Sequence, residues 1–144
     1  RAIELNKPDP EDGLDVLAKV GGFEIGVLAG VMLGTASRRR PVVLDGFISG
    51  AAALIAWTMS PAVRHYFIAS HQSVEPGHQV GLQAMELRPL LDLGMRLGEG
   101  TGAALSMHIV DAAARCLVEM ATFGEAGVSE RSQDDSGDSP GSGA

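Results

Sequence analysis

With 144 residues, this chain can bury one modest hydrophobic core. Hydrophobic residues make up 45% of it, which favours a globular over a disordered chain, while aromatic residues make up only 4% and glycines number 19. The formal net charge of -7, without any basic stripe, excludes a protein that binds nucleic acid along its phosphate backbone.

The sequence also bears on compartment and membrane association. The first residues, RAIELNKPDPEDG, are polar and do not resemble a signal peptide. The longest apolar run, from Phe47 to Met59, is too short to span a bilayer. The single cysteine, Cys116, excludes an internal disulfide and suits a reducing compartment. We therefore expect a cytoplasmic protein with no membrane partner, in which Cys116 is a buried, inert thiol within a helix.

The N-terminal part of the sequence predicts helices. Residues 2–6 are typical of the end of a helix whose beginning is absent, so we expect the chain to be a piece of a longer one. A short helix over 14–20 is followed by two glycines and then by a longer helix over 23–37. In that longer helix, Phe23 and Val27 recur at helical spacing, and Gly26, Gly30 and Gly34 line one side, which suits close packing on a sheet or another helix.

The middle of the chain alternates between predicted strands and helices. Residues 41–44 and 66–69 are short apolar runs that predict buried parallel strands, and residues 90–93 predict a third, shorter one. Helices are expected over 49–59 and, starting at a proline, over 76–86. This alternation predicts an α/β fold, part of a doubly wound parallel sheet with flanking helices.

The end of the chain predicts a long helix and then a tail. Residues 101–121 carry apolar side chains at helical spacing, with Leu105 and Ile109 on one face beside Cys116. The following residues are mainly Ser, Gly, Asp and Pro, which cannot bury enough apolar surface to order themselves.

Polar residues follow two of the predicted strands. In an open parallel sheet, ligands bind beyond the carboxyl ends of the strands, which is where Asp45, Gly46, Ser70 and Ser73 lie. Gly46 allows a substrate to approach the backbone, and the amides that open the next helix favour an anion. The two serine hydroxyls can donate to a phosphate or ribose. The alternative is a turn or capping role for Asp45 and a capping hydroxyl for Ser73.

The segment MRLGEGTGAAL (95–105) contains a carboxylate flanked by glycines. Glu99 lies between Gly98 and Gly100, where the missing Cβ atoms let a flat ligand or a phosphate come close to the backbone. An acid in such a gap, just before a helix, is suited to act as a general base. The alternative is a glycine-rich turn with a solvated Glu99 and Thr101 as N-cap. The segment lacks the GK[ST] ending of a phosphate-binding P-loop, and the chain has no G-x-S-x-G of a serine hydrolase.

One spacing raises a metal hypothesis. His71, Glu75 and His78 form H-x3-E-x2-H, but across a predicted loop rather than along one helix face. We therefore favour a hydrogen-bonded loop that shapes a pocket, and we expect neither a metal nor a cofactor.

Five motifs in order resemble a known family, the nicotinate-nucleotide–dimethylbenzimidazole phosphoribosyltransferases. The resemblance is to the C-terminal part of that family and runs from about residue 2 to residue 129. The motifs are AKVGGFEIGVLAG (18–30), PVVLDGFISGAAAL (41–54), IASHQSVEPGH (68–78), MRLGEGTGAAL (95–105) and EMATFGEAGVS (119–129).

The resemblance implies a reaction and a set of roles. Phosphoribose would pass from nicotinate mononucleotide to 5,6-dimethylbenzimidazole, giving α-ribazole 5'-phosphate and nicotinate, in the synthesis of the lower ligand of cobalamin. Glu99 matches the family's glutamate general base, which we expect to be partly desolvated. Leu97 matches a position against the benzimidazole ring. Gly46 and Ser73 match positions on the phosphoribosyl side.

The resemblance also implies what surrounds this segment. The family is a homodimer with its sites near the subunit interface, and its N-terminal half carries further substrate contacts, so we expect this segment alone to be inactive. We accordingly divide the chain into a connecting segment (1–13), part of the α/β phosphoribosyltransferase domain (14–100), a part of a small helical domain (101–129) and a disordered acidic tail (130–144). The alternative function is a non-catalytic α/β module for ligand binding or oligomerisation.

Overall fold

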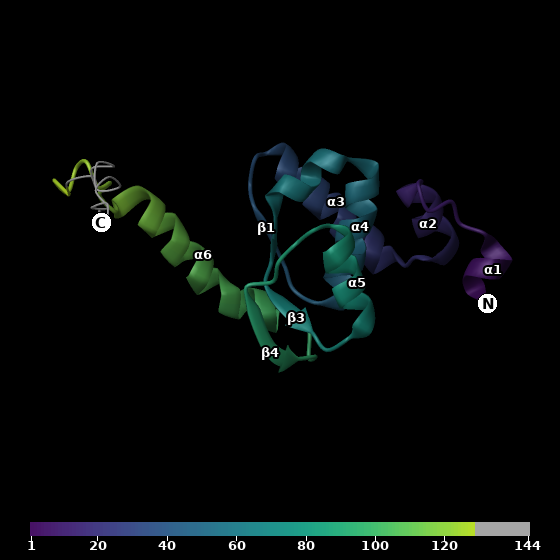
Figure 1. Ribbon diagram of the computed structural model, residues 1–144. Coiled ribbons are helices and arrows are strands. Elements are labelled where there is room, and N and C mark those ends of the chain that lie inside the picture. Colours follow the sequence, from purple (N-terminus) through teal and green to yellow (C-terminus); the bar gives the residue numbers. More distant parts are fainter. Residues whose placement is uncertain (129–144) are drawn as a thin grey trace, which may run out of the picture. The chain divides into compact units, whose positions relative to one another are not determined.

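The computed structural model describes residues 1–128, which fall into two compact units, one over Arg1–Asp111 and one from Ala112 onward. Figure 1 labels most of the elements. In chain order they are α1 (Ala2–Asn6), α2 (Gly13–Val20), α3 (Phe23–Ser37), β1 (Val42–Leu44), α4 (Phe47–Met59), the 3-10 helix η1 (Pro61–Tyr66), β2 (Phe67–Ala69), β3 (His71–Ser73), α5 (Pro76–Ala84), β4 (Leu91–Met95) and α6 (Thr101–Glu119).

The strands form two parallel pairs in the first unit. β1 pairs with β2, and β3 pairs with β4 with an irregular register between His71 and Ser73. β2 leads into β3 through Ser70, whose amide donates to the Leu44 carbonyl oxygen at 3.0 Å while its own carbonyl accepts from the Leu91 amide at 3.0 Å. The predicted α/β class with short parallel strands is confirmed.

One predicted loop is in part a strand. Residues 70–78 were expected to form a polar loop, yet His71–Ser73 is the strand β3. His71 and Ser73 are buried there because hydrogen-bond partners come from residues outside the strand. The alternation of burial along β3 therefore involves polar side chains, which a search for apolar runs does not detect.

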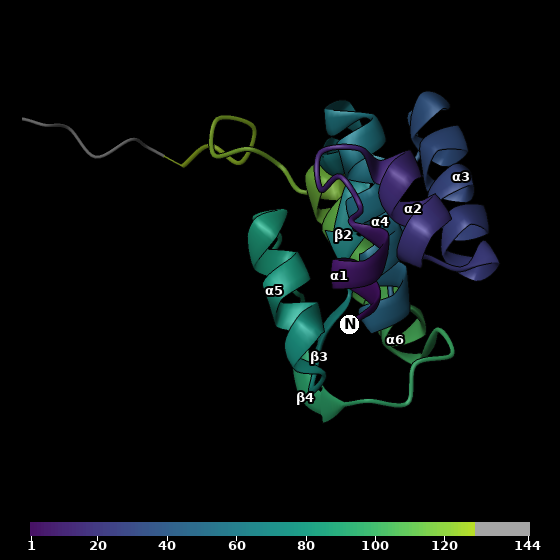
Figure 2. The ribbon, with the colours of Figure 1, turned by 90° about the vertical axis from the view of Figure 1, so that its right-hand side faces the viewer.

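The core of the first unit lies along α4, which is placed between α3 and α5 (Figure 2). Ala52, Ala53 and Ala56 of α4 are completely buried, because alanine side chains allow neighbouring elements to approach closely. The close packing expected on the glycine side of α3 is not found among the described residues, because Gly30 and Gly34 are exposed and a Cβ at either would meet nothing within 4 Å. Phe23 is 95% exposed and Val27 66% exposed. The helix is apolar on nearly every side, so spacing alone does not determine which face is buried.

Helix α6 begins in the first unit and ends in the second. Within the first unit, its buried residues are Gly102 and Ser106, whereas Leu105 and Ile109 of the predicted apolar face are 48% and 41% exposed. In the second unit Cys116 is exposed, which contradicts the predicted buried thiol. The tail predicted for 130–144 lies outside the described residues. Among residues 1–128, no helix is both long enough and apolar enough to cross a membrane.

Candidate active site

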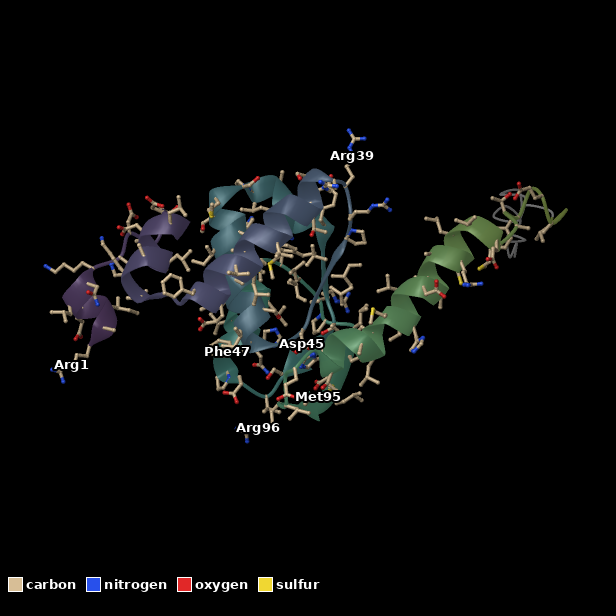
Figure 3. The ribbon with its side chains drawn as sticks, turned by 180° about the vertical axis from the view of Figure 1, so that it is seen from behind. Arg1, Arg39, Asp45, Phe47, Met95 and Arg96 are labelled. Atoms are coloured by element: carbon tan, nitrogen blue, oxygen red, sulfur yellow. The ribbon has the colours of Figure 1, made fainter. Side chains whose placement is uncertain are left out.

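A cavity of about 530 Å³ opens where β1, β3 and β4 end in the first unit. Its walls come from the turn after β1, the start of α4, the strand β3 and the segment between β4 and α6. Figure 3 labels three of the lining residues, Asp45, Phe47 and Arg96. The full lining is Leu28, Asp45, Gly46, Phe47, Ile48, Ser49, His71, Ser73, Glu75, Arg96, Leu97, Gly98, Glu99 and Gly100.

Asp45 connects the end of β1 to the start of α6. Its Oδ2 accepts from the Gly100 amide at 3.1 Å and its Oδ1 accepts from the Ala103 amide at 3.0 Å. A carboxylate at the amides of a helix start satisfies unpaired donors and is stabilised by the helix dipole. Asp45 thus has a capping role at the start of α6. The helix it caps lies 55 residues along the chain and is not the helix that follows it.

The segment around Glu99 has an unusual backbone. Gly98, Glu99 and Gly100 have φ values of 77°, 56° and 79°, so three consecutive residues are left-handed. The other described non-glycine residues with positive φ, Lys7, Arg39 and Glu86, all lie just after a helix, where such a conformation is common. Glu99 instead follows a strand. A non-glycine residue held there without a helix end to explain it motivates a functional hypothesis.

The side chain of Glu99 does not show the expected environment. It lines the cavity but is exposed, so the described residues do not supply the partial desolvation predicted for a general base. Leu97, two residues earlier, also lines the cavity and is 69% exposed. Both side chains therefore lie at the opening of the cavity rather than in its interior.

The start of α4 provides an uncapped helix end inside the cavity. Gly46 is its N-cap and no side chain bonds to the first amides, while residues 46–49 all line the cavity. Free amides at a helix N-terminus favour an anion such as a phosphate. A Cβ on Gly46 would lie 3.6 Å from His71 Cε1, an ordinary contact. Gly46 itself is buried, and the protein does not require glycine there for lack of space.

A mostly buried polar layer forms what we call the floor of the cavity: Asp45, His71 and Ser73, which line it, and Ser70. Ser70 is completely buried and does not line the cavity. Its Oγ donates to the Asp45 carbonyl oxygen at 3.1 Å, and the Oγ of Ser106 donates to the Ser70 carbonyl oxygen at 3.0 Å. The structure thus places Ser70 under the cavity, where it is bonded to neighbouring protein groups.

Ser73 has a turn contact and a place in the cavity wall. Its Oγ accepts from the Glu75 amide at 3.3 Å, but Glu75 is the N-cap of α5 and no side chain caps that helix, so the helix-capping role considered from the sequence is wrong. Its own amide donates to His78 Nδ1 at 3.0 Å. Burial, with a smaller contribution from His71, lowers the pKa of the His78 imidazole below its ordinary value of 6.5, and Asp45 opposes that shift.

The metal hypothesis finds no support among the described residues. His78 Nδ1 is occupied by the Ser73 amide, and Glu75 turns to the Arg96 guanidinium at 3.4 Å. Within residues 1–128 no group of three or more His, Cys, Asp or Glu side chains could hold a metal ion. The favoured loop is also wrong in part, because His71 belongs to β3 and His78 to α5, with Glu75 between them.

At the opening of the cavity, four exposed or half-buried side chains form what we call the rim: Glu75, Arg96, Leu97 and Glu99. Arg96 was not predicted as a site residue, although it stands directly before Leu97 in the motif. It is the one arginine or lysine in the lining of this cavity, which also contains three acids. An anionic ligand needs a cationic partner, and this requirement was the signal that could have identified Arg96 from the sequence.

Comparison with known proteins agrees with this geometry. A family model described as a phosphoribosyltransferase matches residues 1–128. The chain belongs to this phosphoribosyltransferase family. Among curated members, it is 70% identical over 129 residues to the nicotinate-nucleotide–dimethylbenzimidazole phosphoribosyltransferase of Roseiflexus sp. (strain RS-1) and 65% identical over 133 residues to that of Chloroflexus aggregans. These alignments cover 90% and 92% of this chain.

Solved structures support the family assignment. The crystal structure of the enzyme of the same name from Thermus thermophilus is 52% identical, has a TM-score of 0.79 and covers 83% of this chain. The match covers 36% of that structure, and the two curated matches cover 36% and 38% of those relatives. The chain therefore spans a little over a third of the length of the family members that it matches.

Proposed function

We propose that this chain is the C-terminal part of an enzyme that transfers phosphoribose from nicotinate mononucleotide to 5,6-dimethylbenzimidazole, giving α-ribazole 5'-phosphate and nicotinate for the lower ligand of cobalamin. The observation that carries the proposal is the backbone of Glu99. An acid held left-handed between two left-handed glycines opens onto a cavity that also holds an uncapped helix start. The names of the relatives supply the substrates.

The cavity divides into two sides under this proposal. The phosphoribosyl side is the start of α4 with Gly46 and the hydroxyl of Ser73, where free amides favour the phosphate. Asp45 and Ser70 act below it by holding the backbone in place. The base side is the rim, where Leu97 packs on the flat ring and the glycines at 98 and 100 let the ring approach the backbone.

Glu99 acts as the general base in the proposed reaction. The attacking ring nitrogen bonds to the anomeric carbon of the ribose, the bond to nicotinate breaks, and the proton on the benzimidazole passes to the Glu99 carboxylate. Positive charge develops on the ribose as nicotinate leaves, and the carboxylates of the cavity stabilise it. Glu99 is exposed in this chain, so under this proposal the rest of the enzyme covers its carboxylate.

The larger assembly is part of the same proposal. The strands here belong to a doubly wound parallel sheet that the rest of the full-length enzyme completes, residues 101–129 contribute to a small helical domain, and two subunits form a homodimer in the cytoplasm. Residues 1–13 connect to the preceding part, and residues 14–100 form part of the phosphoribosyltransferase domain. This segment alone is then inactive, because the remaining substrate contacts lie outside it.

A chimaera tests the proposal. Residues 1–128 replace the matching segment of the Roseiflexus relative, with which they share 70% identity. Purified chimaera is incubated with nicotinate mononucleotide and dimethylbenzimidazole, and α-ribazole phosphate is measured against the unmodified relative. We expect transfer at a rate within about tenfold of the relative. A folded chimaera that binds the nucleotide yet makes no product would favour the non-catalytic binding module instead.

A further inference from the structure

His71 is the buried polar side chain of the floor to which the proposed reaction gives no role. It is 1% exposed and stands at the first position of β3. A buried imidazole needs hydrogen-bond partners, because an unpaired buried donor or acceptor is costly. Its Nδ1 lies 3.0 Å from Ser70 Oγ and 3.9 Å from Asp45 Oδ1.

The hydrogen bonds around Ser70 decide which ring nitrogen carries a proton. The single hydroxyl proton of Ser70 is directed to the Asp45 carbonyl oxygen at 3.1 Å. Ser70 Oγ can therefore only accept from His71, so Nδ1 bears hydrogen whether the ring is neutral or charged. That N–H also faces the Asp45 carboxylate.

The ring is tightly enclosed by two backbone segments. A Cβ added to Gly102, near the start of α6, would overlap the His71 ring at Nδ1 and Cε1. A Cβ on Gly46 would touch the ring at Cε1 and Nε2. The imidazole thus lies between the turn after β1 and the beginning of α6.

Asp45 connects His71 to the segment that contains Glu99. Its carboxylate accepts from the amides of Gly100 and Ala103, so the position of Asp45 sets the position of the segment that contains Glu99. Small displacements of a catalytic group have large effects, since about 1 Å can change a rate by about a hundredfold.

We propose that His71 is a positioning residue that holds Asp45, and through it the Glu99 segment, in the geometry needed for proton transfer. The kinetic consequence of this proposal rests on the proposed function, whereas its structural consequence does not. Its structural consequence is that the Gly100 and Ala103 amides stay protected only while the Nδ1–H of His71 is present.

Two variants of the chimaera separate this role from simple space filling. His71→Leu keeps a similar volume but removes the donor, whereas His71→Asn is smaller but can place an amide N–H near the position of Nδ1. Amide hydrogen exchange is measured at Gly100 and Ala103, with the Met85 amide, which donates to the Gly81 carbonyl in α5, as an internal control. We expect exchange at Gly100 and Ala103 to accelerate at least about tenfold in His71→Leu and much less in His71→Asn.

Kinetics provide the second measurement. We expect His71→Leu to lower kcat by about tenfold to a hundredfold with the KM for nicotinate mononucleotide within about threefold, and His71→Asn to recover most of the loss. If exchange at both amides is unchanged in His71→Leu, or if the smaller Asn performs worse than Leu, the positioning role is wrong. An inactive parent chimaera would count against the proposed function alone, because hydrogen exchange still decides the role of His71.

Discussion

The floor and the rim of the cavity differ in how their side chains are held. Asp45, Ser70, His71 and Ser73 are mostly buried, and hydrogen bonds from several elements fix them. Glu75, Arg96, Leu97 and Glu99 are more exposed, and the ion pair between Arg96 and Glu75 is long and solvent-accessible. Such exposed pairs contribute little stability.

This difference shows which part of the candidate site is complete within this segment. The floor has all the partners it requires from residues within the first unit. The rim carries the proposed base, Glu99. In the segment around Glu99 the backbone is constrained, by the left-handed residues and by the hydrogen bond to Asp45, but the side chain is not. We therefore expect changes at the rim to alter catalysis and leave stability unchanged, and changes at the floor to alter both.

The strongest test of the rim is Glu99→Gln in the chimaera. The amide cannot accept the benzimidazole proton, so kcat should fall by about 10² to 10⁴, with little change in the KM for nicotinate mononucleotide or in the melting temperature. Steady-state kinetics and calorimetry measure these quantities. Turnover within about threefold of the parent would remove Glu99 from the role of general base.

A matched control is available for that change. Glu86 also has a positive φ, of 51°, but it lies outside the cavity and pairs with Arg64. Glu86→Gln removes a carboxylate from a similar backbone conformation, so kcat should stay within about twofold. A comparable loss of kcat in both variants would point to a general effect of charge.

The strongest test of the floor is Gly102→Ala. The new methyl group would overlap the His71 ring, and overpacking of this kind typically costs about 1–3 kcal/mol. The control is Gly34→Ala in α3, where nothing lies within 4 Å and alanine should stabilise the helix by about 0.5–1 kcal/mol. Chemical denaturation of the chimaera measures both. Equal stability of the two variants would show that the His71 ring can be displaced at little cost in stability and that the floor is not rigid.

Much of the fold was predictable because helices and apolar strands have local signals. The helix over 23–37 and the start of α5 at Pro76 agree with the structure, as do the central residues of three strands. The buried face of α3 was not predictable, because a helix that is apolar all round has no preferred face in sequence. Strand β3 was missed because its buried residues are polar and find their partners in other elements.

The candidate site shows the same division. Asp45, Gly46, Ser73 and the Gly98–Gly100 segment were located in sequence because glycines and strand ends have a recognisable chemistry, and the structure brings them to one cavity. The contact between Asp45 and Gly100 spans 55 residues, so no local pattern could show it. Ser70 was expected to face a ligand, but residues distant in sequence bury it.

A smaller effect is expected at Arg96. It stands next to Leu97 on the proposed base side, so we expect its guanidinium to contact the carboxylate of nicotinate. Arg96→Met should raise the KM for nicotinate mononucleotide by about threefold to tenfold, since the residue is largely exposed. The KM for nicotinamide mononucleotide, which lacks that carboxylate, should not change. Arg88→Met, outside the cavity, is the control. An equal rise for both nucleotides would place Arg96 on the phosphate instead.

The smallest expected effect is the acid sensitivity of His78, whose Nδ1 accepts from the amide of the floor residue Ser73. Burial lowers the folded-state pKa of His78 below 6.5, so below about pH 6.5 the unfolded chain binds a proton more readily than the folded one. The stabilisation is complete above that pH and is lost as the pH falls towards the lowered pKa. His78→Asn should therefore flatten the decline of the chimaera's melting temperature between about pH 7.5 and 5.5, whereas His65→Asn, at an exposed histidine, should not. Calorimetry across this range measures the slope. Because Ser73 donates its amide to His78 Nδ1, a slope unchanged by His78→Asn would mean that this bond survives protonation through rearrangement, and the floor would then be less rigid than its burial indicates.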